Sequence, residues 1–295
     1  MNQENNMDIE QKVFSYPSFQ IGKNHFEPSE LIQMDTEISI HELIGKEEGF
    51  IKNIVIVGAW RGDEVSSFLK YKEVNIFCFE PNPQNFLYLK KRYQNTPNVH
   101  CFPLACGATK GVVELHESNI TGTDSILPIL ESSSMSLTKK HSVEMCRLDD
   151  ILELKNKTID LLWIDVQGFE LEVLKGAELL LQKCLAIFTE VNERNQDYKS
   201  AVSYTVLTTY LQDNDFRLLA QGINKTDPKN IGGNALFVEK NNKIKYSFFD
   251  NFSQRIQKRL QKDSLKRNLY SIKTLRSLSF LLPISFKIFI KKYIN

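Results

Sequence analysis

The sequence lacks the features that mark secreted and membrane-spanning proteins. Its five cysteines include no C-x-x-C pair, and most lie in apolar runs, where a free thiol behaves as a small hydrophobic group. This usage is typical of a reducing compartment. The first ten residues are polar and acidic, which excludes an ordinary secretory signal. The longest apolar run, 278–290, contains Pro283 and Lys287 and is too short to cross a bilayer. We therefore expect a cytoplasmic protein.

Acidic residues are scarce at the end of the chain. Residues 250–295 contain eleven Lys/Arg and two Asp/Glu, a net charge of +9, which leaves −8 on the remaining 249 residues. Within 252–282, apolar residues recur every three to five positions with Lys and Arg between them, which predicts a basic amphipathic helix. Two interpretations stay open for 252–295. One is peripheral contact with the anionic inner face of a membrane, and the other is packing on the body of the chain or on a second subunit of a homo-oligomer. Leucines opposite the lysines argue against a nucleic-acid partner.

Short apolar runs rich in Val, Ile and Phe alternate with helical patterns from residue 53 onward. The runs cover 53–58, 75–80, 99–104, 159–165, 184–191, 215–220 and 234–239, and the helical patterns cover 64–71, 84–93, 170–182 and 204–213. Continuous apolar runs of this length are typical of strands buried on both faces. The alternation predicts an α/β fold with a mainly parallel sheet covered by helices on both faces.

This pattern places one α/β domain at 51–240, between an N-terminal extension at 1–50 and the basic tail at 241–295. Residues 107–150 interrupt the alternation with strand-like segments around a Ser/Thr-rich stretch. We expect a hairpin and a loop there, over the edge or mouth of the sheet. Ligands of open α/β sheets bind beyond the carboxyl ends of the strands, so polar residues at those ends are the candidate site residues.

The first candidate is the turn VGAWRG at 57–62, directly after an apolar run. Gly58 and Gly62 allow a tight turn in which backbone N–H groups approach a ligand, although a plain turn is the alternative interpretation. Asp63 and Glu64 follow and would repel a pyrophosphate. The G-x-G-x-x-G of dinucleotide loops is absent, as is any Tyr-x-x-x-Lys pair. Both absences argue against an NAD-type oxidoreductase.

The second candidate is Glu80, in FCFEPNP at the end of the second apolar run. A carboxylate at this position can accept hydrogen bonds from both hydroxyls of a ribose. Pro81 and Pro83 stiffen the chain as it leaves the strand. We favour the ribose role over a helix cap or a surface position.

Two further acidic strand ends are Asp165 in WIDVQG and Glu190, with Asn192, in FTEVN. If the two strands are neighbours, these side chains lie close together. They then bind a divalent cation such as Mg²⁺ through hard oxygen ligands, or hold a substrate hydroxyl for deprotonation. The structural alternative is that they cap helices or bind the backbone of the 107–150 loop.

Taken together, these segments resemble the FkbM-type S-adenosylmethionine-dependent methyltransferases over about residues 53–240. The blocks that carry the resemblance are VGAWRG (57–62), FEPNP (79–83), RLDDI (147–151), IDVQGFELEVLKGAE (164–178), TEV (189–191) and GNALFVE (233–239). Their order and spacing agree with the family pattern. The 164–178 block is the strongest of them.

The resemblance implies a Rossmann-like seven-stranded sheet with six parallel strands and an antiparallel last one. It also implies transfer of a methyl group from S-adenosylmethionine to a hydroxyl of a sugar, glycan or polyketide-type acceptor. The residues that it assigns to the cofactor are Gly58, Ala59, Trp60, Gly62, Glu80, Pro81 and Asp165. Asp165 is the first candidate for the base that removes the hydroxyl proton. His141 and Asp149, which the 107–150 region can bring over the cleft, are the others, although His141 lies in a stretch typical of solvated surface.

The chain departs from the family pattern at two positions of the first turn. Ile56 stands where members commonly have Asp, and Trp60 stands where they have Asn. Loss of the Asp removes a contact to the methionine amino group, which bears on cofactor affinity more than on fold. Trp60 either stacks on the cofactor or substrate or packs under the N-terminal extension. The two departures also motivate an alternative function, a binding protein that keeps the fold without the activity.

Overall fold

The computed structural model describes residues 19–21, 24–26, 51–69, 71, 73–193, 197–221 and 232–240. By contacts the chain divides into a unit at Met1–Lys245 and a second at Tyr246–Asn295. The predicted basic helix lies outside the described residues. Of the N-terminal extension, the structure describes only an antiparallel pair, β1 (Phe19–Ile21) and β2 (Asn24–Phe26).

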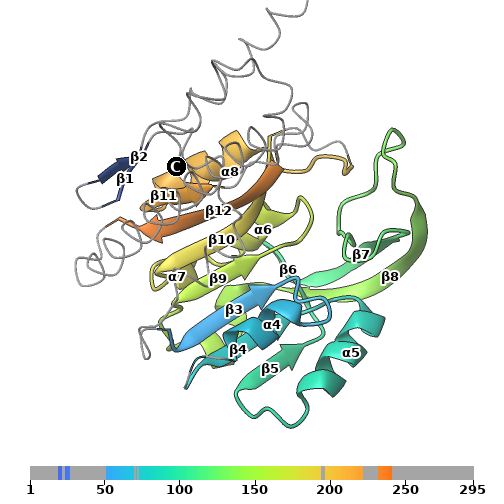
Figure 1. Ribbon diagram of the computed structural model, residues 1–295. Coiled ribbons are helices and arrows are strands. Elements are labelled where there is room, and N and C mark those ends of the chain that lie inside the picture. Colours follow the sequence, from blue (N-terminus) through green and yellow to red (C-terminus); the bar gives the residue numbers. More distant parts are fainter. Residues whose placement is uncertain are drawn as a thin grey trace, which may run out of the picture. The chain divides into compact units, whose positions relative to one another are not determined.

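The main sheet has seven strands in the order β11-β12-β10-β9-β3-β4-β5 (Figure 1). The strands are β3 (Asn53–Val57), β4 (Asn75–Phe79), β5 (Val99–Phe102), β9 (Leu161–Ile164), β10 (Ala186–Asn192), β11 (Phe216–Gln221) and β12 (Gly232–Glu239). Neighbours from β5 to β10 pair in parallel, and β12 runs antiparallel to both β10 and β11. The predicted sheet, six parallel strands with an antiparallel last one, is confirmed.

Alternate residues of the central strands pack on opposite faces of the sheet. Val55 and Val57 belong to a core cluster with residues of α6 (Glu170–Lys175), α7 (Glu178–Leu181) and α8 (Tyr204–Asp213). Phe68 of α4 (Asp63–Phe68) makes an edge-on ring contact with Trp163 of β9, whose neighbours Leu162 and Ile164 are in that cluster. Both faces are therefore covered, which is why these strands read as continuous apolar runs.

The helical pattern at 170–182 forms two short helices, α6 and α7, and not the single helix that its periodicity predicts. The break lies at Gly176, where the carbonyl of Gly107 packs against the helix. A Cβ on Gly176 would lie 2.0 Å from that carbonyl oxygen. Tertiary packing thus overrides the local periodicity. The helices α4, α5 (Pro83–Tyr93) and α8 lie close to their predicted places.

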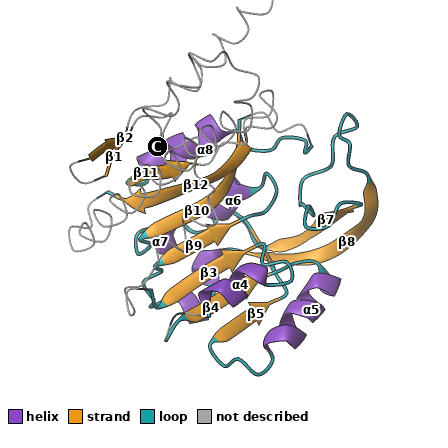
Figure 2. Ribbon diagram, viewed as in Figure 1, coloured by secondary structure: helices purple, strands orange, loops and turns teal. Residues whose placement is uncertain are grey.

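Residues 105–146 form a small second sheet on the carboxyl-end side of the parallel strands (Figures 1 and 2). It comprises β6 (Ala105–Cys106), β7 (Gly111–Ser118) and β8 (Leu137–Cys146), with β7 and β8 antiparallel. Leu115, Val143 and Met145 form its core with Ala105. The expected hairpin is confirmed. Two 3-10 turns, η1 (Leu148–Asp150) and η2 (Leu152–Leu154), lead from it to β9.

All five cysteines are free thiols. Among the described residues, no helix is both long enough and apolar enough to cross a membrane.

Candidate active site

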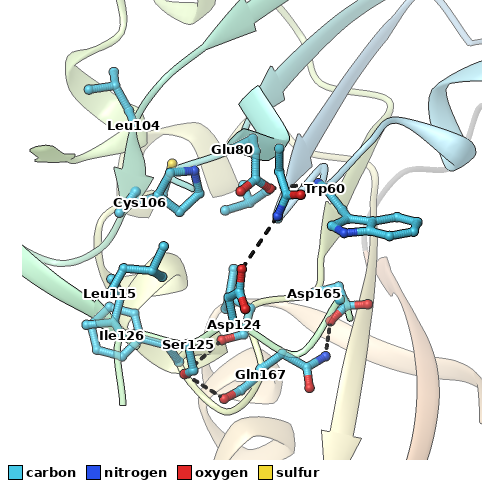
Figure 3. Close-up of a pocket in the computed structure, with 18 of the residues that line it drawn as sticks. Trp60, Glu80, Leu104, Cys106, Leu115, Asp124, Ser125, Ile126, Asp165 and Gln167 are labelled. Atoms are coloured by element: carbon cyan, nitrogen blue, oxygen red, sulfur yellow. Dashed lines mark hydrogen bonds between the residues drawn. The ribbon is translucent and has the colours of Figure 1, made fainter. Parts of the chain in front are cut away.

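A pocket lies at the carboxyl ends of β3, β4 and β9, between the main sheet and the loop that joins β7 to β8 (Figure 3). Its lining comprises Val57, Gly58, Trp60, Glu64, Glu80, Pro81, Asn85, Leu104, Ala105, Cys106, Leu115, Gly122, Asp124, Ser125, Ile126, Asp165, Val166, Gln167 and Phe169. Two opposite sides of the pocket carry side chains of different character. Leu104, Cys106 and Leu115 lie on one side, whereas Trp60 and Asp165 lie on the other (Figure 3).

The turn after β3 is fixed to the end of β4. The backbone N–H groups of Gly58 and Ala59 both donate to the Phe79 carbonyl, at 3.0 Å each. Gly58 has a φ of +82°, and a Cβ there would lie only 1.8 Å from the carbonyl oxygen of Asp165. Glycine at this position therefore lets the ends of β3 and β9 approach each other, which brings Asp165 into the pocket.

Gly62 precedes α4 as its N-cap and packs closely against α5. Its φ is +78°, and a Cβ there would lie 2.6 Å from side-chain atoms of both Leu89 and Tyr93. The Tyr93 hydroxyl donates to the Gly62 carbonyl. Gly62 and Ala59 are absent from the lining of the described pocket, whereas the other residues assigned to the cofactor, Gly58, Trp60, Glu80, Pro81 and Asp165, belong to it.

The two departures from the family pattern differ in their surroundings. Ile56 is fully buried in the sheet and does not line the pocket, whereas its neighbour Val57 does. Trp60 lines the pocket in a left-handed conformation with a φ of +44°, which is uncommon for a bulky residue. Its buried indole N–H has no hydrogen-bond partner in the part of the chain that the structure describes.

Glu80 is a buried carboxyl that holds the turn. It is 5% exposed, and its two oxygens accept one backbone hydrogen bond each, from Trp60 N–H at 2.7 Å and from Asn82 N–H at 2.8 Å. Burial raises the pKa of Glu80 to about 7, against the opposing effect of these two hydrogen bonds. Each oxygen keeps a second lone pair for a ligand. Glu80 is therefore a polar anchor in the wall of the pocket.

The loop between β7 and β8 supplies four residues of the pocket lining that the sequence did not reveal, among them the polar residues Asp124 and Ser125. Asp124 accepts a hydrogen bond from the Asn82 amide at 2.7 Å, and burial raises its pKa. Ser125 donates to the Gln167 carbonyl at 2.9 Å. These bonds fasten the loop to the ends of β4 and β9 and close the pocket on the side of the hairpin. The Ser/Thr-rich composition was the only signal in the sequence.

Gln167 joins the two acidic strand ends. Its amide nitrogen donates to Asp165 at 2.7 Å and to Glu190 at 2.9 Å. Burial, with the nearby charge of Asp165 as the next cause, raises the pKa of Glu190 well above its usual range. Gln167 has a φ of +56°. The motif that contains Gln167 gave no indication of this role.

The turn that carries Gln167 is held by Glu170 from inside. This carboxyl is 3% exposed and accepts backbone hydrogen bonds from Gly168 at 2.9 Å and Val166 at 3.4 Å. Burial raises the pKa of Glu170 to about 7. The polar side of the pocket thus rests on a rigid strand-to-helix turn.

The expected divalent-cation site at Asp165, Glu190 and Asn192 is not supported. The amide nitrogen between the two carboxyls is a hydrogen-bond donor and not a metal ligand. In the described ranges, no group of three or more His, Cys, Asp or Glu side chains comes together as a metal site. We therefore do not propose Mg²⁺ for this protein.

The other two candidate bases, Asp149 and His141, are not among the residues that line the described pocket. Asp149 caps α7, because its carboxylate accepts the backbone N–H groups of Leu179 at 3.1 Å and Leu180 at 2.9 Å. His141 lies in β8 and pairs with Glu117. It is 8% exposed, so the expectation of a solvated position was wrong. Neither residue lines the described pocket, and we propose neither as the base.

The fold and the pocket together define an α/β methyltransferase. The chain belongs to the family described as the methyltransferase FkbM domain, whose model matches residues 57–218. It is 28% identical over 198 residues to the 2-O-methyltransferase NoeI of Sinorhizobium fredii. The aligned region covers 62% of this chain and 77% of NoeI.

The chain also aligns at low sequence identity with solved structures of methyltransferases. The magnesium protoporphyrin IX methyltransferase from Synechocystis PCC 6803 has a TM-score of 0.42 and 8% identity, over 79% of this chain and 91% of that one. A methyltransferase from Aquifex aeolicus has a TM-score of 0.39 and 14% identity, over 79% and 97% of the two chains. The assignment of this chain to the methyltransferases rests on the family match and on the order of its strands.

Proposed function

We propose that the protein is an S-adenosylmethionine-dependent O-methyltransferase that acts on a hydroxyl of a sugar or glycan. The observation that carries the proposal is the buried carboxyl of Glu80 at the end of β4, in a pocket with an apolar side and an acidic side. The name of the relative NoeI, a 2-O-methyltransferase, supports oxygen as the methyl acceptor.

The residues present fit S-adenosylmethionine. Leu104, Cys106 and Leu115 offer an apolar surface for an adenine ring, and Glu80 offers acceptors for the ribose hydroxyls. Gly58 and Asp165 follow β3 and β9 directly and both line the pocket, so the methionine part can reach the ends of these two strands. When bound, the cofactor supplies an electrophilic methyl group on a sulfonium.

Asp165 is the proposed base. Its carboxylate lines the pocket and would accept the proton of the acceptor hydroxyl. Gln167 holds this carboxylate by a hydrogen bond of 2.7 Å, which fixes its direction. Burial and the nearby charge of Asp165 raise the pKa of Glu190 well above its usual range, which favours the neutral form of this carboxyl beside Asp165. Positioning of the hydroxyl by this rigid turn supplies most of the rate enhancement that the chain's own residues provide.

The test is to incubate the full chain with S-adenosylmethionine labelled with ¹³C in its methyl group and with carbohydrate extracted from the source cells. We expect a labelled O-methyl resonance in the carbohydrate. Label on nitrogen or carbon, or no transfer by a protein that binds the cofactor, would contradict the proposal. The last outcome would favour a binding protein that keeps the fold without the activity.

Glu80 predicts a pH dependence of cofactor affinity. The ribose hydroxyls need the ionised carboxylate as acceptor, and the pKa of Glu80 in the free protein is about 7. Protonation as the pH falls through 7 therefore weakens binding, by about tenfold between pH 8 and pH 6. Glu80→Gln removes this dependence and weakens binding at pH 8 by about 30-fold. Calorimetric titration with S-adenosylhomocysteine measures both effects.

The control for this titration is Glu153→Gln, at an exposed position of η2 before β9. It should keep both the affinity and the pH dependence of the wild type. If the affinity of Glu80→Gln depended on pH as strongly as that of the wild type, the group whose protonation weakens binding would not be Glu80.

A further inference from the structure

Three neighbouring side chains form a cationic and aromatic cluster beside the pocket. The guanidinium carbon of Arg61 lies 5.0 Å from the ring centroid of Trp60 and 5.5 Å from that of Tyr88. Trp60 belongs to the pocket lining. Arg61 and Tyr88 are exposed, Tyr88 to 52%. The cluster, Trp60–Arg61–Tyr88, therefore connects the pocket to solvent.

Trp60 carries two signs of a ligand contact. Its left-handed backbone is held by the hydrogen bond from its N–H to Glu80, and such strained conformations concentrate at functional sites. Its indole N–H is buried and has no partner among the described residues, which is unfavourable unless a ligand accepts the hydrogen bond. The indole lies on the same side of the pocket as Asp165, away from Leu104 and Leu115 (Figure 3). This is the side of the proposed base.

Arg61 forms no ion pair with the described residues. No carboxylate in the part of the chain that the structure describes forms an ion pair with it. Contact with two aromatic rings orients a planar guanidinium and leaves its N–H fork available to an anion. The charged side chains that line the described pocket are all carboxylates, Glu64, Glu80, Asp124 and Asp165. An anionic group is therefore expected at the rim beside Arg61 and not deep in the pocket.

We propose that this cluster is the acceptor subsite and that the acceptor is a sugar with an anionic substituent, a phosphate or a carboxylate. Arg61 binds the substituent, Tyr88 holds Arg61, and the Trp60 indole N–H donates to an oxygen of the sugar. This inference rests on the proposed function, because it takes the hydroxyl at Asp165 as the methyl acceptor.

The test measures sugar binding to the full chain with S-adenosylhomocysteine at saturation. The probes are glucose 6-phosphate, glucuronate and methyl glucoside, which carry a phosphate, a carboxylate and no charge. We expect at least one anionic probe to bind about tenfold more tightly than the neutral one. Arg61→Gln should reduce this preference to less than twofold. The order of the two anionic probes distinguishes a sugar phosphate from an acidic sugar.

The matched control is Lys155→Gln, which removes one positive charge at an exposed position before β9, at the amino end of the strand. It should keep the tenfold preference. Trp60→Phe keeps a ring without the N–H and should weaken all three probes to a similar extent.

Four results would overturn the inference. Three concern the preference for anionic probes: no such preference in the wild type, an equal loss of it in Lys155→Gln, or an unchanged preference in Arg61→Gln. A fourth is a tenfold loss of S-adenosylhomocysteine affinity in Arg61→Gln, which would assign Arg61 to the methionine carboxylate. Failure of the wild type to bind S-adenosylhomocysteine at all is a different outcome. It would contradict the proposed function itself.

Discussion

Gly58→Ala is expected to lower the free energy of unfolding by about 3–5 kcal/mol and to abolish cofactor binding. Alanine disfavours the φ of +82° at this position, and its Cβ would meet the Asp165 carbonyl at 1.8 Å. This carbonyl is backbone, so the ends of β3 and β9 must separate to relieve the contact. Separation displaces Asp165 and the turn that carries Trp60. Urea unfolding and titration with S-adenosylhomocysteine measure the two effects.

Gly122→Ala is the matched control for the loss of stability in Gly58→Ala. Gly122 has nearly the same φ, +84°, but nothing lies within 4 Å of a Cβ placed there. The strain of the left-handed backbone alone costs about 1–2 kcal/mol. The difference between the two variants therefore isolates the contact with Asp165. Equal losses of stability would show that the close approach of β3 and β9 is not what requires glycine at position 58.

Asp165→Asn is expected to reduce kcat for methyl transfer by about a thousandfold, because the amide cannot accept the hydroxyl proton. The replacement has nearly the same shape and keeps an oxygen for the hydrogen bond from Gln167. Affinity for S-adenosylhomocysteine should therefore change by less than about threefold. Single-turnover rates and calorimetry separate the two quantities. A large loss of affinity with little change in kcat would make Asp165 a cofactor ligand and not the base.

Asp160→Asn controls for the loss of one carboxylate near β9. Asp160 precedes this strand at its amino end and accepts the backbone N–H groups of Lys52 and Asn53, at 2.8 and 2.9 Å. The variant should lose some stability and keep kcat. A comparable fall in kcat would point to a general weakening of the strand.

The sheet was predictable from the sequence because its strands are buried on both faces. In NIVIV the four residues after Asn53 are buried and apolar, as a strand covered on both faces requires. The polar residue that follows such a run then marks the carboxyl end of the strand, where ligands bind. Glu80 and Asp165 were found in this way, and both line the pocket. The antiparallel direction of the last strand followed from the resemblance to the family, because apolar runs alone do not specify strand direction.

The residues that were missed or misplaced depend on contacts between distant segments. Asp124 enters the pocket through a hydrogen bond to Asn82, 42 positions away. Asp149 binds the start of α7, about 30 positions away, and no local pattern indicates that partner. For His141 a signal was present. His141, Val143 and Met145 alternate with exposed residues along β8, which indicates burial on one face, but the two lysines before His141 suggested a solvated surface.

The most direct test of the central claim is a crystal structure of the full chain with S-adenosylhomocysteine. The account predicts the adenine beside Leu104 and Cys106, the ribose hydroxyls within hydrogen-bonding distance of Glu80, and the homocysteine part toward Gly58 and Asp165. A ligand bound elsewhere, or a ribose that makes no contact with Glu80, would contradict it.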